Sequence, residues 1–316
     1  MYNRRKFVKG ITLAAASIPF SGVLASEIIG KQFNKYPILF FTKPLDKYEP
    51  EFMAETLAMT GVEGFDLTVR PKGIVLPERV SDDLPKIIEM GRKYNLSSEM
   101  MVTAIKNIDE PFAKEVLTVA AKNGIKHYRL GYYNYDLKKG IVESLIDVKS
   151  QMKKLAGLNE KLGIQAGYQN HSGTRVGAPV WDVWEVIKDL PREWMSSQFD
   201  VRHAVAEGSA SWILMMRLLS KNIGSLAIKD STWDVSKGKA RAVKMPLGEG
   251  IVDFELYFKT LKELNIVAPI TLHVEYKLLN DDEEKKTLLQ KQKIFVSKIK
   301  KDVDFIKSNL INHQLI

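Results

Sequence analysis

Short apolar runs alternate along the chain with longer segments in which apolar residues recur every three or four positions. The short runs are rich in β-branched and aromatic residues, which is typical of buried strands. The longer segments have the spacing of amphipathic helices, as in 51–61, 82–95 and 111–124, and several end in Gly or Asn, which favour a helix C-cap. The runs predict eight strands, at 37–41, 64–69, 97–104, 127–133, 164–170, 195–201, 225–230 and 270–276.

Alternating strands and helices predict a parallel sheet, because parallel strands need long crossover connections. Eight strand–helix units are the number that closes a TIM barrel, which needs about 250 residues, and the chain has 316. The main rival is an open doubly wound sheet, but no glycine-rich phosphate-binding sequence follows the first strand. We therefore expect an α/β fold with a single (β/α)8 barrel over 37–316, including a long C-terminal helix.

The first residues have a different character. A basic segment (3–10) precedes an apolar stretch and small residues near Ala25, which are the parts of a cleavable export signal. Arg4 and Arg5 resemble a twin-arginine signal, and the apolar stretch is too short to span a bilayer. We expect a signal over 1–26, a lead-in over 27–36, and a periplasmic mature chain exported by the twin-arginine machinery, without stable membrane insertion. The alternative is a basic amphipathic helix.

Composition adds two points. The chain has no cysteine, so no disulfide can form. Its formal net charge is +9, and many of the lysines lie in 285–307, opposite the apolar positions of a predicted helix. No aromatic platform or nucleic-acid motif accompanies these lysines, so we interpret them as a solvated helix face and expect no nucleic-acid partner.

Polar residues lie at the carboxyl ends of the predicted strands, where TIM barrels place their functional groups. Three of the five histidines are there: His171, His203 and His273. The other candidates near strand ends or within strands are Arg70, Glu99, Arg129, Gln169, Asp200, Lys229 and Glu275.

This set of side chains suits a divalent metal and proton transfer. Carboxylates, imidazoles and an amide can hold Mn, Mg, Co or Zn. A metal bound to two oxygens of a hydroxy-ketone acidifies the carbon between them, and a lysine or histidine then moves the proton. Each of these groups also has a purely structural interpretation. Asp200 could cap a helix N-terminus, Glu275 could lie at an exposed strand end, and His203 could form a hydrogen bond in a loop. Lys229 and Asp230 could form a surface ion pair, and Arg129 could brace carboxylates of the barrel.

Five short motifs occur in order along the chain: QNH (169–171), DVRH (200–203), IKD (228–230), LGEG-IVDF (247–254) and LHVEY (272–276). Their order and spacing over about residues 37–290 resemble the xylose isomerase-like TIM barrel family. Its members are often described as sugar phosphate isomerases/epimerases, and relatives include inosose dehydratases, keto-sugar epimerases and endonuclease IV.

The resemblance implies four metal ligands: Glu, Asp, His and Glu on strands five to eight. Asp200 and Glu275 match the second and fourth, whereas Gln169 and Ala227 stand at the first and third. Either a histidine completes the metal site of Asp200, Glu275 and Gln169, or the site works through Lys229 and the histidines. The resemblance also implies that His203 contacts substrate hydroxyls. Glu249 lies either in a loop that closes toward the substrate or in a simple turn.

Together these features predict a carbohydrate isomerase, epimerase or dehydratase that abstracts a proton beside the carbonyl of a sugar or keto-sugar. No phosphate cradle is visible, so sugar phosphates are not favoured. Two alternatives are a sugar-binding barrel that has lost catalysis and an endonuclease IV-like nuclease, which needs more histidines. The predicted roles are catalysis for Lys229, His203, His171 and His273, substrate binding for Arg129, Glu99, Arg70 and Glu249, and metal binding for Asp200, Glu275 and Gln169.

Overall fold

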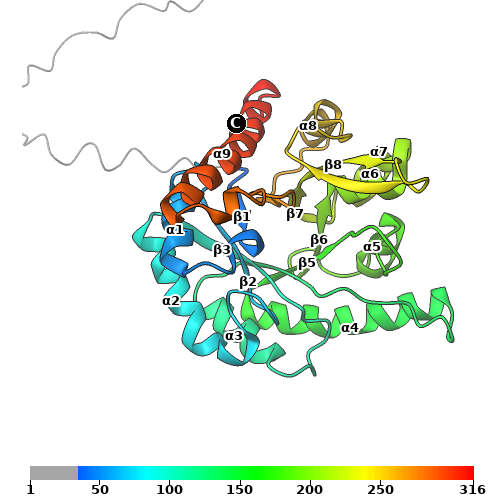
Figure 1. Ribbon diagram of the computed structural model, residues 1–316. Coiled ribbons are helices and arrows are strands. Elements are labelled where there is room, and N and C mark those ends of the chain that lie inside the picture. The colour runs from blue at the N-terminus through cyan, green and yellow to red at the C-terminus, as the bar shows by residue number, and fades with distance from the viewer. Residues whose placement is uncertain (1–34) are drawn as a thin grey trace, which may run out of the picture. The chain divides into compact units, whose positions relative to one another are not determined.

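A computed structural model describes residues 35–316. Eight parallel strands close a barrel in the order β1-β2-β3-β4-β5-β6-β7-β10, so the predicted α/β barrel is confirmed (Figure 1). All eight predicted strands are present: β1 Ile38–Phe41, β2 Gly64–Thr68, β3 Ser97–Val102, β4 His127–Arg129, β5 Gln165–Gln169, β6 Met195–Asp200, β7 Ile223–Ile228 and β10 Ile270–Leu272.

Helices surround the barrel on the outside (Figure 1). They are α1 Pro50–Ala58, α2 Val80–Lys93, α3 Ala113–Lys122, α4 Ile141–Leu162, α5 Val180–Ile187, α6 Val201–Gly208, α7 Trp212–Leu219, α8 Phe254–Glu263 and α9 Leu288–Asn312. Short 3₁₀ helices occur at Lys43–Leu45, Pro77–Arg79, Ser209–Ser211 and Glu283–Lys285. In 35–316, no helix is both long and apolar enough to cross a membrane.

The barrel closes at β1, which pairs on one side with β2 and on the other with β10. Phe40 lies in register with Phe65 of β2 and with Leu272 of β10, and all three side chains are buried. Burial of each such side chain stabilises the fold by about 1.5–3 kcal/mol. Strands covered on both faces need apolar residues throughout, which is why short apolar runs located them in the sequence.

An antiparallel hairpin, β8 Asp230–Asp234 and β9 Arg241–Met245, follows β7 after one intervening residue, Lys229. The sequence prediction missed this hairpin, because its strands are largely polar and partly exposed and so lack an apolar alternation. Because Lys229 directly follows the last residue of β7, it lies at the carboxyl end of the barrel. The predicted export signal (1–26) and most of the lead-in (27–36) lie outside the described residues.

Candidate active site

The centre of the site is an ion-paired triad of Asp200, Lys229 and Glu275. The Lys229 Nζ lies 3.1 Å from Asp200 Oδ2 and 3.0 Å from Glu275 Oε1. The side chains of Lys229 and Asp200 are 4% and 0% exposed, and that of Glu275 is 23% exposed. Burial alone lowers the pKa of Lys229, but attraction to Asp200 and Glu275 outweighs it and leaves the pKa above its ordinary value. The ammonium is therefore fully charged at neutral pH.

Asp200 ends β6 and also begins α6. Its Oδ1 accepts a hydrogen bond from the His203 backbone N–H at 3.0 Å, so the N-cap alternative is correct. Its Oδ2 accepts a hydrogen bond from Gln169 Nε2 at 2.8 Å and pairs with Lys229. The Asp200 carboxylate therefore both caps α6 and takes part in the site, and the capping hydrogen bond fixes its position.

Gln169 is held in one orientation by its neighbours. Its Oε1 accepts hydrogen bonds from Arg129 Nη1 at 2.9 Å and from the Tyr132 hydroxyl at 2.5 Å. Because Arg129 can only donate and the Asp200 carboxylate can only accept, the amide oxygen must face Arg129 and the amide nitrogen must face Asp200. Arg129 therefore orients the Gln169 amide, whereas the alternative for it was a brace for carboxylates; among residues 35–316 it has no carboxylate within 4.0 Å.

The rings of His171 and His203 lie next to each other, with centroids 3.9 Å apart. The Nδ1 atom of His203 is 2.9 Å from Arg202 Nη1 and 3.2 Å from the Ser172 backbone N–H. Both partners donate, so Nδ1 carries the lone pair and Nε2 the hydrogen. Within 35–316 this buried Nε2 has no hydrogen-bond partner and lies 3.9 Å from Asp200 Oδ2.

His171 has the opposite tautomer. Its Nδ1 lies 2.9 Å from the carbonyl oxygen of Ser172, which only accepts, so Nδ1 carries the hydrogen and Nε2 the lone pair. Burial lowers the pKa of His171 and lowers that of His203 well below its ordinary value, and the positive charge of Lys229 adds to both effects. Both imidazoles are therefore neutral at neutral pH, one offering an N–H and the other a lone pair.

His273 forms a second buried pair with Asp66, a residue of β2 that the sequence analysis did not select. His273 Nε2 lies 4.0 Å from Asp66 Oδ2, and the His273 ring stacks on Phe41 with centroids 4.4 Å apart. Burial lowers the pKa of His273 to about 3 and raises that of Asp66 to about 6. The sequence feature that could have identified Asp66 is a single carboxylate among the apolar residues of a strand.

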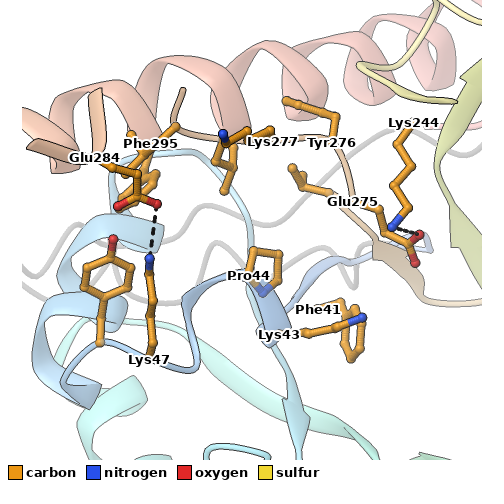
Figure 2. Close-up of a pocket in the computed structure, with 14 residues that line it drawn as sticks. Phe41, Lys43, Pro44, Lys47, Lys244, Glu275, Tyr276, Lys277, Glu284 and Phe295 are labelled. Atoms are coloured by element: carbon orange, nitrogen blue, oxygen red, sulfur yellow. Dashed lines mark hydrogen bonds and ion pairs between the residues drawn. The ribbon is translucent and has the colours of Figure 1, made fainter. Parts of the chain in front are cut away.

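A cavity of about 300 Å³ opens beside Glu275 (Figure 2). Lys43 and Phe41 lie on the same side of it as Glu275, and the Lys244 Nζ lies 3.6 Å from Glu275 Oε2. Arg70 lies over the Phe41 ring at 5.7 Å, and in the described part of the chain it has no carboxylate within 4.0 Å. The electrostatic surroundings of Lys43 include Glu275, Arg70, Lys244 and Lys229, so the rim of the site is basic.

The structure does not bring Glu99 and Glu249 to the site. Glu99 pairs with Lys126 at 2.7 Å, and Lys126 precedes β4, at the opposite end of the barrel. Glu99 lies early in β3, near the amino end of the strand, which is why its prediction as a substrate-binding residue at the carboxyl end was wrong. Glu249 is exposed and pairs with Lys301 of α9 at 2.5 Å, so it lies in a surface turn, as the alternative for it held.

Asp230 organises that turn. Its carboxylate accepts hydrogen bonds from the backbone N–H groups of Gly248 at 3.1 Å, Gly250 at 2.9 Å and Val252 at 3.3 Å. A Cβ atom on Gly250 would lie 2.2 Å from Asp230 Oδ1, which explains glycine at this position. Asp230 therefore holds the loop and does not form the surface ion pair with Lys229 that was one alternative.

The side chains present do not fit a divalent metal. In residues 35–316, no group of three or more His, Cys, Asp or Glu side chains is placed to hold a metal ion. Among the expected ligands, Asp200 and Glu275 are bridged by an ammonium, and Gln169 turns its NH₂ group toward Asp200. The predicted metal therefore has no donor set in this arrangement.

Comparison with known proteins places the chain in a family. The family model for xylose isomerase-like TIM barrels matches residues 85–295. Among solved structures, a xylose isomerase domain protein from Planctomyces limnophilus is 14% identical, with a TM-score of 0.61 over 89% of this chain and 99% of that one. No curated protein matches by sequence.

Two further structures resemble this chain. A D-allulose 3-epimerase from Methylomonas sp. is 15% identical, with a TM-score of 0.64 over 87% of this chain and 98% of that one. A D-tagatose 3-epimerase-like protein is 14% identical, with a TM-score of 0.63 over 89% and 100%. At these identities the likeness shows a common fold. Together with the family match, it identifies the chain as a member of the xylose isomerase-like TIM barrel family.

Proposed function

We propose that this protein is a sugar isomerase or epimerase that moves a proton on the carbon beside the carbonyl of a keto-sugar. The observation that carries the proposal is the buried Lys229 ammonium beside two neutral imidazoles of opposite tautomer. The family and the sugar 3-epimerases of the same fold support the substrate class.

Abstraction of a proton beside a carbonyl places negative charge on the carbonyl oxygen, so such a site needs a base and an oxyanion-stabilising group. The His171 Nε2 lone pair takes the proton. The electron pair of the broken C–H bond forms the carbon–carbon double bond of an enediolate, and the oxyanion accepts hydrogen bonds from the Lys229 ammonium and the His203 Nε2–H. Return of the proton from His171 to the former carbonyl carbon, with transfer of the hydroxyl proton from one enediolate oxygen to the other, gives the isomer. Delivery of a proton by water to the opposite face of the first carbon, with loss of the His171 proton to solvent, gives the epimer.

The remaining groups orient the sugar. Glu275 is the exposed member of the triad and lies on the cavity wall, where its carboxylate can accept hydrogen bonds from sugar hydroxyls. Arg70 extends over Phe41 without a carboxylate within 4.0 Å among the described residues, so its guanidinium N–H groups are available to ligand oxygens.

Proton exchange in heavy water tests this proposal. The protein is incubated with a panel of keto-hexoses and keto-pentoses, and NMR follows loss of the hydrogens beside the carbonyl and the appearance of new sugars. We expect exchange with at least one keto-sugar, and a loss of at least about 100-fold in His171→Asn, the usual contribution of a general base. Binding without exchange for every sugar would instead support the sugar-binding barrel that has lost catalysis.

We also propose that residues 1–26 direct export by the twin-arginine route and that the mature protein works in the periplasm. The basic segment, the short apolar stretch and the small residues near Ala25 support this proposal. Fractionation of cells that express the full chain tests it: replacement of Arg4 and Arg5 by lysine should retain the protein, uncleaved, in the cytoplasm.

A further inference from the structure

We propose that Lys229 takes the place of the divalent metal that the family resemblance implies, so that this protein uses an ammonium group as its electrophile. The inference rests on the site of the proposed function but concerns which cation lies between Asp200 and Glu275. It is therefore tested by metal binding, which does not require that the correct sugar be known.

The first argument is the position of the charge. Asp200 and Glu275 stand at two of the four implied ligand positions, and the Lys229 Nζ lies 3.1 Å and 3.0 Å from their oxygens. A divalent metal binds carboxylate oxygens at about 2.0–2.2 Å, so it would have to occupy the same small volume as the ammonium. Two cations cannot share that volume, and the ammonium is covalently tethered at the end of β7.

The second argument concerns the other two positions. Ala227 stands where the resemblance implies a histidine, and it lies in register with Asp200 across β6 and β7 without any donor atom. Gln169 directs its NH₂ group at Asp200, because its oxygen accepts hydrogen bonds from Arg129 and Tyr132. A reversed amide would place donors against Arg129 and a lone pair against a carboxylate. Both positions thus suit an ammonium-based site.

The third argument is the balance of charge. Replacement of a divalent cation by one lysine would leave Asp200 and Glu275, together with that lysine, at a net charge of −1. The hairpin supplies a second cation, because Lys244 of β9 lies 3.6 Å from Glu275 Oε2. Lys229 and Lys244 together match the charge of Asp200 and Glu275, as a divalent metal would.

The chemistry follows from the number of donors. An ammonium has three N–H groups; Glu275 accepts a hydrogen bond from one of them, and even with a second directed at Asp200, which lies 3.1 Å from Nζ, one is left. The third remains for a substrate oxygen, with the His203 Nε2–H as a second donor in the same site. A metal would chelate two oxygens of the substrate, whereas this pair donates hydrogen bonds to one oxyanion.

The experiment measures manganese binding to the full-length protein after treatment with a chelator, by equilibrium dialysis and by the electron paramagnetic resonance signal of free Mn²⁺. We expect wild type to bind less than about 0.1 equivalent at about 100 μM Mn²⁺, the behaviour of a site without a dedicated donor set. Binding of one equivalent, lost in Glu275→Gln but kept in the surface control Lys301→Met, would overturn the proposal.

A second measurement uses Lys229→Met, which removes the ammonium and keeps the length of the side chain. Without the ammonium between them, Asp200 and Glu275 should bind Mn²⁺ at least tenfold more tightly than they do in the wild type, and Mn²⁺ should raise the thermal midpoint of the variant. If Lys229→Met does not fold, the wild-type titration still decides. Once an exchanging sugar is known, treatment with a chelator should leave the exchange rate within twofold of its original value. Loss of exchange after chelation, with recovery on addition of Mn²⁺, would refute the proposal. A lack of exchange with every sugar would refute only the proposed function.

Discussion

His171 and His203 lie with ring centroids 3.9 Å apart and carry their hydrogens on different nitrogens. Ser172 takes part in both arrangements: its carbonyl oxygen accepts a hydrogen bond from His171 Nδ1, and its backbone N–H donates to His203 Nδ1. One residue that contacts the Nδ1 atom of both rings therefore helps to fix the two different tautomers.

The first prediction concerns Arg202, a positioning residue for His203. Its Nη1 donates to His203 Nδ1 at 2.9 Å, and its positive charge helps to lower the pKa of His203. In Arg202→Met the pKa of His203 should rise, because one repulsive charge is lost. Nuclear magnetic resonance titration of the imidazole carbons checks the shift. An unchanged His203 titration with a reduced rate would contradict the positioning role.

The second prediction concerns Asp66 and pH. Burial raises its pKa from 3.8 to about 6, so the folded state binds this proton more tightly than the unfolded state. The contribution of Asp66 to stability is therefore favourable at low pH and is lost as pH rises from about 4 to about 6. Asp66→Asn keeps an acceptor for Thr271 and should stabilise the protein by about 1–3 kcal/mol at neutral pH. Urea unfolding at about pH 4 should show little difference from wild type, and an equal gain at both pH values would exclude this cause.

The third prediction concerns the loop at Asp230. Asp230→Ala removes the carboxylate that accepts hydrogen bonds from the backbone N–H groups of Gly248, Gly250 and Val252. We expect a loss of about 2–4 kcal/mol in stability and faster proteolytic cleavage within 247–252. Gly250→Ala should give the same cleavage pattern, because its Cβ would lie 2.2 Å from Asp230 Oδ1. Glu249→Ala, in the same loop but exposed, is the matched control and should leave the pattern unchanged.

The fourth prediction concerns Gln169. Gln169→Glu restores the carboxylate of the family pattern but places it beside Asp200, where the amide nitrogen now donates at 2.8 Å. Two adjacent buried carboxylates repel each other, so stability at neutral pH should fall by about 2–4 kcal/mol, and by less at about pH 5, where one of them is protonated. Thermal unfolding across this range checks the difference. A variant as stable as wild type at neutral pH would mean that the amide orientation does not fix the site.

The barrel strands could be predicted because each one is buried on both faces, and burial imposes a continuous apolar run. The β8–β9 hairpin could not, because its partly exposed strands carry Lys244 and other polar residues without such a pattern. Residues that end a strand, such as Asp200, were placed correctly by that position. Glu99 failed because it lies early in its strand, where the chain is at the other end of the barrel.

The interactions that each side chain makes could not be predicted from the spacing of residues in the sequence. Asp200 and Glu275 are found by sequence, but only their distances to Lys229 show that an ammonium joins them. The orientation of the Gln169 amide likewise depends on Arg129 and Tyr132, which belong to a different segment of the chain. These are relations between strands, which a one-dimensional pattern does not contain.

The side chains of the neighbouring residues Lys229 and Asp230 are held by different parts of the structure. One side chain is tied to the carboxylates over the barrel and the other to the amides of the 247–252 turn. The 247–252 turn and the Lys229 ammonium are therefore linked through a single peptide unit, so a displacement of the turn is passed directly to the backbone that carries the ammonium.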